Sequence, residues 1–168
     1  MTDIYRVACA AGFSGDRLGV AKPLVQELIR LKGPGCLIFE SLAERTLALA
    51  QLERRQNDQF GYEPLLAEMV APILSDCIGN GIPIVGNFGA ANPSAAAALI
   101  YRIAKEQGIV DIKIAIVEGD DIAGPQFNEV IRNSLSDEDQ TVLSKSTIVS
   151  ANVYLGAREI ADALSAGA

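Results

Sequence analysis

The sequence has 168 residues, of which 49% are hydrophobic and only 5% aromatic. A chain of this length fits one domain with a single aliphatic core. The formal net charge is −7, so we expect neither a nucleic-acid nor a membrane-surface partner. No window approaches the roughly 18 apolar residues of a membrane span, and the N-terminus lacks a signal pattern, so we expect a cytoplasmic protein.

Histidine is absent, which excludes a Ser-His-Asp triad, a Cys-His dyad and a His-ligated zinc within this chain. Acid–base chemistry therefore has to come from Asp, Glu, Lys, Tyr or Cys side chains. The three cysteines, Cys9, Cys36 and Cys77, are widely spaced in apolar surroundings. We interpret them as small buried residues rather than as a disulfide framework or a metal site.

Strands and helices are predicted to alternate along the chain. Short runs of β-branched and small apolar residues indicate the strands, and apolar residues at helical spacing indicate the helices. The predicted elements are, in order, a strand over 4–10, a helix over 21–31, a strand over 36–40, helices over 41–56 and 65–81, a strand over 82–87, a helix over 94–108, a strand over 112–118, a helix over 125–135, a strand over 147–153 and a helix over 157–168.

Local signals refine two of these helices. Ser41 and Glu44 have the spacing of a capping box at the start of the 41–56 helix, whose apolar stripe includes Leu49 and Leu52. Asn92 is a predicted N-cap, and Pro93 follows it at the first helical position.

The alternation predicts an α/β fold, with a parallel, Rossmann-like three-layer sheet that has helices on both faces, and a single domain over 1–168. In such a sheet every strand-to-helix loop emerges at the carboxyl-terminal edge, where α/β proteins bind ligands. We therefore expect the polar residues of five loops to gather at this edge.

The loop after the first strand contains Gly12, Ser14, Gly15, Asp16 and Arg17. Backbone amides of a glycine-containing loop before a helix can bind a phosphate or carboxylate, and an arginine there supplies the counter-charge. We therefore predict that these five residues bind an acidic group of a small molecule.

Dinucleotide binding is an alternative for the same loop. Its glycine spacing, GxxGxxxG, is one residue longer than that of extended short-chain dehydrogenases, and Glu40 lies where a ribose-binding acid is expected. Tyr101 and Lys105 match the YxxxK of those enzymes, but they lie inside a predicted helix, so we interpret the match as accidental and Tyr101 as packed.

Three acidic residues, Glu118, Asp120 and Asp121, follow the predicted fourth strand. Close carboxylates can bind Mg²⁺ or another divalent cation, grip hydroxyls, or act as acid and base. Either aspartate could instead simply cap the following turn. We propose Asp120 and Asp121 as catalytic candidates and leave the cofactor open.

Two further loops carry amide side chains. Asn87, Gly89 and Asn92 lie beside a predicted helix N-terminus, a setting that can orient a carbonyl or an anion. Capping explains Asn92 but not Asn87, which we add to the catalytic candidates. Asn152 and Tyr154 follow the last predicted strand, and a structural role for the tyrosine remains equally open.

Five motifs, GFSGD, FGYEP, VGNFGAANP, VEGDD and VSANVYLGA, resemble in order and spacing the N-terminal part of the acyclic terpene utilisation AtuA-like family, once described as a domain of unknown function. The resemblance spans essentially the whole chain. It departs at Ser14, where we expect a larger aromatic residue, and at Gly89-Ala90, where we expect two glycines. Family members are longer, so the resemblance implies the N-terminal portion of a longer domain.

The resemblance implies a role in the catabolism of acyclic terpenes through acyl-CoA intermediates, with no assigned reaction. One hypothesis is an enzyme acting on an anionic substrate such as a CoA thioester, with Asn87 and Asn152 orienting a carbonyl and Asp120 or Asp121 transferring a proton. The alternatives are a noncatalytic ligand-binding or partner subunit, and an NAD(P)-dependent dehydrogenase-like protein. A homo-oligomer is left open.

Overall fold

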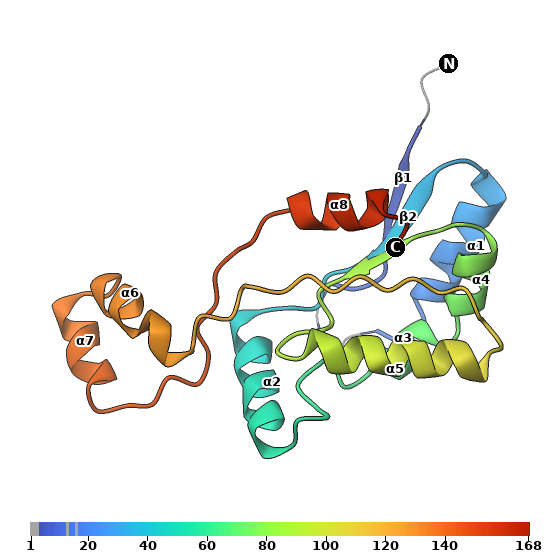
Figure 1. Ribbon diagram of the computed structural model, residues 1–168. Helices are drawn as coiled ribbons and strands as arrows, with labels where there is room; N and C mark the ends of the chain where they lie inside the picture. The colour runs from blue at the N-terminus through green and yellow to red at the C-terminus, as the bar shows by residue number, and fades with distance from the viewer. Residues whose placement is uncertain (1–3, 13, 16) are drawn as a thin grey trace.

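The computed structural model describes residues 4–12, 14, 15 and 17–168, and its sheet has three parallel strands (Figure 1). The strands are β1 (Arg6–Cys9), β2 (Gly35–Phe39) and β3 (Ile84–Gly86), in the order β1-β2-β3. In the register of the sheet, Cys36 of β2 pairs with Val7 of β1. An α/β fold with a parallel sheet is therefore confirmed, but the open sheet has three described strands rather than five.

Eight α-helices and one 3-10 helix surround or follow the sheet within the described residues. They are α1 (Ala21–Leu31), α2 (Glu44–Gln56), α3 (Leu66–Val70), α4 (Leu74–Gly79), α5 (Pro93–Glu106), η1 (Pro125–Phe127), α6 (Asn128–Asn133), α7 (Asp137–Leu143) and α8 (Arg158–Ser165).

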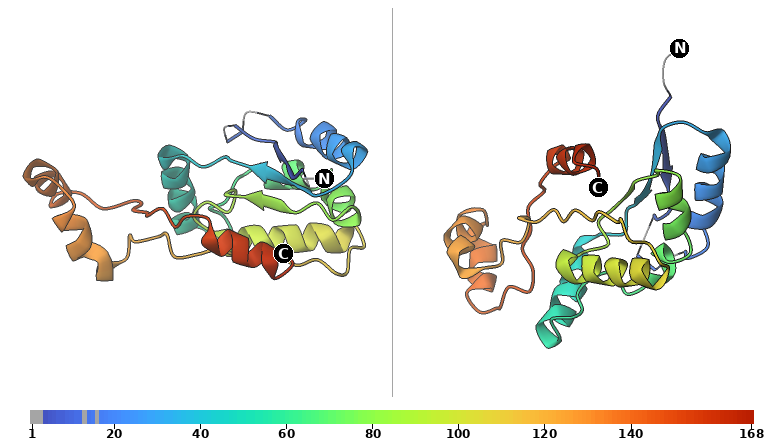
Figure 2. Two further views of the ribbon diagram at one scale, coloured as in Figure 1. Left: turned by 90° about the horizontal axis from the view of Figure 1, so that it is seen from above. Right: turned by 45° about the vertical axis from the view of Figure 1, so that its right-hand side comes forward.

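The core lies where β2 meets the helices that connect the strands. Leu37 of β2, Val25 of α1 and Leu66 of α3 are each fully buried. Helix α1 packs against β1 and β2, while α3 packs against α5, and Figure 2 shows α1 and α4 alongside the strands. Burial of these aliphatic side chains stabilises the sheet and so positions the carboxyl ends of its strands.

The strands predicted over 112–118 and 147–153 are wrong. Among the residues that the structure describes, the backbone N–H groups of 110–121 donate to no backbone carbonyl, and a single bridge between the two regions joins Asp121 to Asn152. Ile112 and Ile114 pack against the core and are partly buried, while the residues between and after them are mostly exposed to solvent. The 112–118 segment has no neighbouring described strand, and without one apolar alternation does not produce a ladder.

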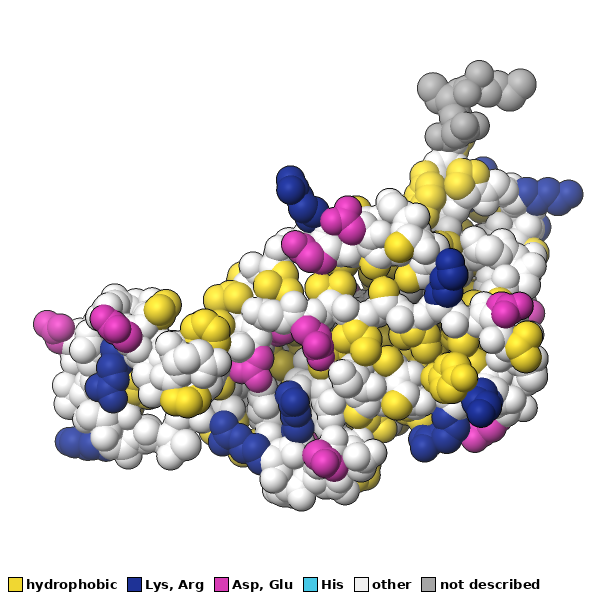
Figure 3. Space-filling model, in the orientation of Figure 1, with side chains coloured by type: hydrophobic (Ala, Val, Ile, Leu, Met, Phe, Trp, Pro, Cys, Tyr) yellow, Lys and Arg dark blue, Asp and Glu magenta, His cyan; other side chains and the backbone are white. Residues whose placement is uncertain are grey.

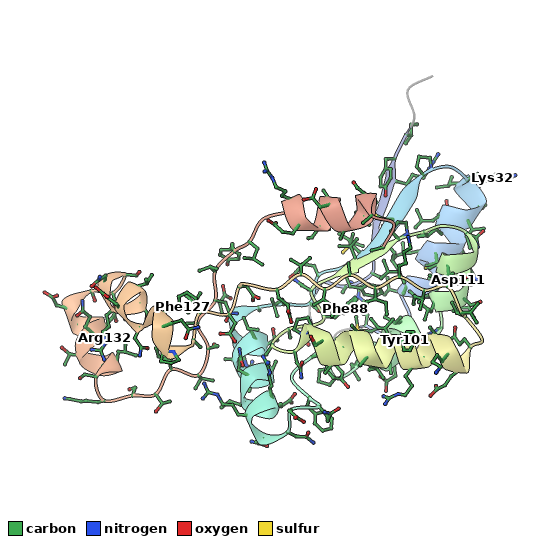
Figure 4. The ribbon with its side chains drawn as sticks, in the orientation of Figure 1. Lys32, Phe88, Tyr101, Asp111, Phe127 and Arg132 are labelled. Atoms are coloured by element: carbon green, nitrogen blue, oxygen red, sulfur yellow. The ribbon has the colours of Figure 1, made fainter. Side chains whose placement is uncertain are left out.

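The remaining C-terminal part of the chain is open. Past Ala104, none of the described residues is buried. Helices α6 and α7 extend away from the sheet in both further views (Figure 2). Figure 4 labels Phe127 of η1 and Arg132 of α6 in this part of the chain. Among the described residues, no helix combines the length and apolarity that crossing a membrane requires.

Two predicted helices differ from the structure, and one observed helix was not predicted. Helix α2 begins at Glu44, not Ser41, and its start is held by Thr46, whose hydroxyl accepts from the Ala43 N–H at 2.8 Å. The predicted 65–81 helix is divided into α3 and α4 around Pro72, which lacks the N–H that a continuous helix needs. Helix α7 was missed, although Ser136 accepts a capping hydrogen bond from Asp139 N–H at 3.2 Å.

The apolar stripe predicted for α2 is confirmed only in part. Its members Leu49 and Leu52 are 50% and 41% exposed, whereas Ala50, also in the predicted stripe, is buried together with Leu47 and Gln51. The buried face therefore includes a polar side chain, and this face contributes to the cleft described below. In α5, by contrast, the prediction is confirmed, because Asn92 Oδ1 accepts from Ala95 N–H at 3.2 Å and Pro93 is the first helical residue.

The cysteines divide into one exposed and two buried residues. Cys36 and Cys77 are buried as predicted, but Cys9 is exposed near the end of the edge strand β1. Burial, and secondarily the charge of Asp76, raises the pKa of the Cys77 thiol to about 11. The thiolate is the reactive form of cysteine, so Cys77 is inert in the folded protein at neutral pH.

We expect the folded protein at pH 8 to react quickly with a thiol reagent at Cys9 alone, and the urea-unfolded protein to react at all three cysteines. Because the Cys77 thiol ionises first in the unfolded chain, its contribution to stability is present at lower pH and is lost as pH rises toward about 11. Time-resolved thiol titration with peptide mapping measures this, and rapid modification of Cys77 at pH 8 in the folded protein contradicts it.

Candidate functional site

The carboxyl ends of β2 and β3 bring together one predicted site residue and two neighbours. Asn87 Oδ1 accepts from the Ser41 N–H at 2.9 Å, and Asn87 Nδ2 donates to Glu40 Oε1 at 3.0 Å. Asn87 follows β3 directly, so the adjacent ends of two parallel strands create this contact. The side chain is half-buried and joins the two loops at the predicted edge of the sheet.

The glycine loop after β1 contacts a residue that sequence reasoning did not select. The Ser14 hydroxyl donates to Glu63 Oε2 at 2.5 Å, and Glu63 is 5% exposed. A serine has a single O–H donor, and here it is directed at a carboxylate. In this arrangement the hydroxyl hydrogen of Ser14 is already directed at Glu63, and anion binding by the backbone amides of this loop stays a prediction.

A cleft of about 400 Å³ lies between α2 and the segment 118–126. Glu118, Asp120, Asp121 and Asn152 line it, so it gathers four predicted residues from two separate loops. From other elements it is lined by Gln51, Arg54, Arg55, Ala90, Ala91 and Pro93. Acidic and basic side chains lie next to one another over α2 on this face of the molecule (Figure 3).

Helix α2, rather than the sheet, holds the acidic loop at the cleft. Gln51 Nε2 donates to Asp121 Oδ2 at 2.9 Å, and the other carboxylate oxygen of Asp121 accepts from Ala123 N–H at 2.9 Å. Asn152 Nδ2 donates to Asp120 Oδ2 at 2.8 Å. The two aspartates are therefore oriented by different amide side chains.

The arginines of α2 complete the cleft. Arg54 Nη1 donates to the Ala91 carbonyl at 2.5 Å, and Arg55 Nη2 donates to the carbonyls of Ile148 and Val149 at 2.8 Å each. These bonds attach the loop before α5 and the 147–153 segment to α2. A guanidinium has five N–H donors, and the described bonds use one nitrogen of each.

A family model described as the acyclic terpene utilisation family protein AtuA matches residues 5–168. The chain belongs to the acyclic terpene utilisation family AtuA. No curated protein and no solved structure matches it significantly. The family resemblance seen in the five loop motifs is thus confirmed across the chain.

In this AtuA family member, the loop before α5 has an unusual backbone. Ala90 adopts a φ of 46°, a left-handed conformation that favours glycine. A Cβ at Gly89 would lie 2.9 Å from Pro93 Cα, so this residue has to be glycine to allow the close approach. The expected pair of glycines is therefore needed sterically at Gly89 and favoured conformationally at Ala90.

Several predicted residues of this family member lie outside the cleft. Tyr154 is 98% exposed, and the cleft lining does not include it. Asn92 donates both N–H groups of its amide, at 2.7 Å and 2.8 Å, to the carbonyls of Asp58 and Phe60, so it acts as a cap and loop tether. The first-loop residues Gly12, Gly15 and Arg17 are exposed, and Asp16 lies outside the described residues.

The acidic residues of the AtuA chain do not gather into a cluster for the divalent cation that the sequence left open. Among the described residues, no three His, Cys, Asp or Glu side chains are close enough to bind one ion. Glu118 instead accepts from Ser94 Oγ at 3.3 Å, while Asp120 and Asp121 each accept from an amide side chain.

Tyr101 and Lys105, the pair that matches the YxxxK of dehydrogenases, do not line the cleft of this family member. Tyr101 is 51% exposed rather than packed, and Lys105 Nζ lies 5.8 Å from the centroid of its ring. Both residues belong to α5, along which Figure 4 shows Tyr101, and the cleft lining includes neither.

Sequence reasoning missed Gln51, Arg54, Arg55 and Glu63. Gln51 carried a usable signal, because it lies four residues after Leu47 and so shares a helix face with it. Arg54 lies on the same side three residues later. Glu63 carried a weaker signal, as an acid between aromatic and proline residues in a loop. Only the folded chain places it against Ser14.

Proposed function

We propose that this AtuA family member binds an anionic acyl compound of the CoA thioester class in the cleft between α2 and residues 118–126. The observation that carries the proposal is the convergence of Arg54 and Arg55 with Asp120, Asp121 and Asn152 around one cavity. Family membership supplies the link to acyclic terpene utilisation.

The arginine, amide and carboxylate side chains of the cleft would have different roles in the proposed chemistry. The unused N–H groups of Arg55 would hold a carboxylate or phosphate of the ligand by charge-assisted hydrogen bonds. Asn152 would orient a carbonyl, and Asp120 or Asp121 would accept or return a proton. Asp121 is already fixed by hydrogen bonds to both of its oxygens, so we favour Asp120 for the proton transfer.

We infer a Rossmann-like three-layer arrangement, in which helices cover both faces of the parallel sheet. The packing of α1 against β1 and β2 supports one helical layer. The cleft is lined by Ala90 and Ala91 of the loop that follows β3, and loops that follow the strands are the general location of ligand sites in such sheets.

Thermal shift with acyl-CoA thioesters that carry branched, unsaturated acyl chains tests the binding. A ligand present at 100 times its Kd is expected to stabilise the folded protein by about 2.7 kcal/mol. Arg55→Gln should abolish the shift, whereas Arg45→Gln, an exposed residue of α2 outside the cleft lining, should leave it unchanged. A shift with NAD(P) alone would favour the dehydrogenase alternative, and no shift with any ligand would favour a partner subunit.

The variants Asp120→Asn and Asp121→Asn separate an enzyme from a binding protein. If Asp120 transfers a proton, Asp120→Asn should keep the thermal shift while thioester turnover falls by about 10²- to 10⁴-fold. Turnover is measured by mass spectrometry of the incubated thioester. Binding by the wild-type protein without conversion of any thioester would exclude the catalytic role.

A further inference from the structure

The Ser14–Glu63 pair lies outside the proposed cleft and is not explained by it. Ser14 is half-buried in the turn after β1, whereas Glu63 is almost fully buried in the loop before α3. Their oxygen atoms are 2.5 Å apart, within the range of a hydrogen bond between a hydroxyl and a carboxylate. The cleft lining includes neither residue.

Glu63 is held in place from several directions. Its backbone N–H donates to the Phe88 carbonyl at 2.8 Å, and its carbonyl accepts from the Leu66 N–H at 3.0 Å. Its second carboxylate oxygen, Oε1, accepts from the Leu65 N–H at 3.2 Å. The carboxylate is therefore fixed with Oε2 directed at the serine.

This is the arrangement of a nucleophile beside a base that a third group orients. A carboxylate that accepts the serine proton during attack can activate the hydroxyl without histidine, which this chain lacks. Burial of Glu63 limits competition from water for the same oxygen. Ser14 itself is only half-buried, so the proposed nucleophile lies in a turn that is partly accessible to solvent.

We propose that Ser14 and Glu63 form a nucleophile–base pair that acts on oxygen esters of acyl groups. Ser14 Oγ forms a bond to the acyl carbon while its proton moves to Glu63 Oε2. The bond from the acyl carbon to the leaving oxygen breaks, and Glu63 returns the proton to that oxygen. Water then attacks the acyl-serine with the same proton transfers, releasing the acid and restoring Ser14.

Labelling with diisopropyl fluorophosphate tests the pair directly. Ser14 Oγ would displace fluoride from phosphorus, with the proton leaving through Glu63, to form a stable adduct on Ser14. We expect one adduct per folded chain, located at Ser14 by peptide mapping and absent in Ser14→Ala. Glu63→Gln should slow labelling by at least about 100-fold.

Two matched controls belong to the experiment. Glu68→Gln removes an exposed carboxylate of the nearby helix α3 and should leave the labelling rate unchanged. Ser165, an exposed serine whose hydroxyl donates to the Ala161 carbonyl at 2.8 Å, should remain unlabelled. Circular dichroism of each variant checks that it is folded.

The proposal is overturned if the folded wild-type protein forms no Ser14 adduct, or if Glu63→Gln reacts as fast as the wild type. Should Glu63→Gln fail to fold, Glu63→Asp and a comparison of folded with urea-unfolded wild-type protein replace it, and equal rates in the last comparison also overturn the proposal. None of the cleft residues takes part, so this result is independent of the thioester-binding experiment.

Discussion

Replacing Leu37 with alanine is expected to lower the free energy of unfolding by about 3 kcal/mol, a typical cost for truncating a fully buried leucine. Leu37 is 0% exposed in the central strand β2 and pairs with Ile84 of β3. The substitution removes apolar contacts with the helices around the sheet and leaves a cavity that the paired strands cannot close. Urea denaturation followed by circular dichroism measures the loss.

Leu49→Ala is the matched control, because it makes the same chemical change at a leucine of α2 that is 50% exposed. Its effect should lie within about 0.5 kcal/mol of zero. Equal losses in the two variants would mean that β2 is not the centre of the core.

Replacing Gly61 with alanine is expected to destabilise the protein by about 3 kcal/mol, through combined steric overlap and backbone strain. Gly61 has a φ of 98°, and an added Cβ would lie 2.7 Å from Arg54 Cβ and 2.9 Å from the Ala50 carbonyl oxygen. The loop and α2 would have to separate. Since Arg54 lines the cleft, the change should also weaken thioester binding beyond its effect on stability.

Gly79→Ala is the control for this variant. Gly79 ends α4, its φ is outside the left-handed region, and a Cβ there would contact nothing within 4 Å. This substitution should be neutral or stabilise the protein by up to about 1 kcal/mol. Calorimetric melting of both variants gives the comparison, and a Gly61→Ala protein as stable as Gly79→Ala would show that the loop does not need its close approach to α2.

The candidate cleft explains why α2 has a polar residue on its buried face. Gln51 is 6% exposed and bonded to Asp121, and Arg55 is bonded to the 147–153 segment. These contacts replace the strand ladder that the sequence pattern had predicted for the C-terminal segments. The predicted acidic loop therefore reaches the site through helix contacts instead of through a strand.

Local sequence was sufficient for the features that depend on near neighbours in the chain. The alternation of β1, α1 and β2, the Asn92 cap with Pro93, and the position of Asn87 after β3 all follow from residue type and spacing. The family was also evident from five loop motifs, because a motif is a property of the sequence itself. Because Asn87 directly follows β3, it lies at the carboxyl-terminal edge of the sheet, as predicted.

The tertiary structure decided what depends on distant partners. The 112–118 segment has the composition of a strand, but no described strand lies beside it. A ladder of backbone hydrogen bonds forms only between two adjacent strands, so the composition of one segment is not enough. The contacts of Glu63 with Ser14 and of Gln51 with Asp121 join residues 49 and 70 positions apart. No local periodicity encodes such contacts, because they arise only when packing of the core brings separate loops together.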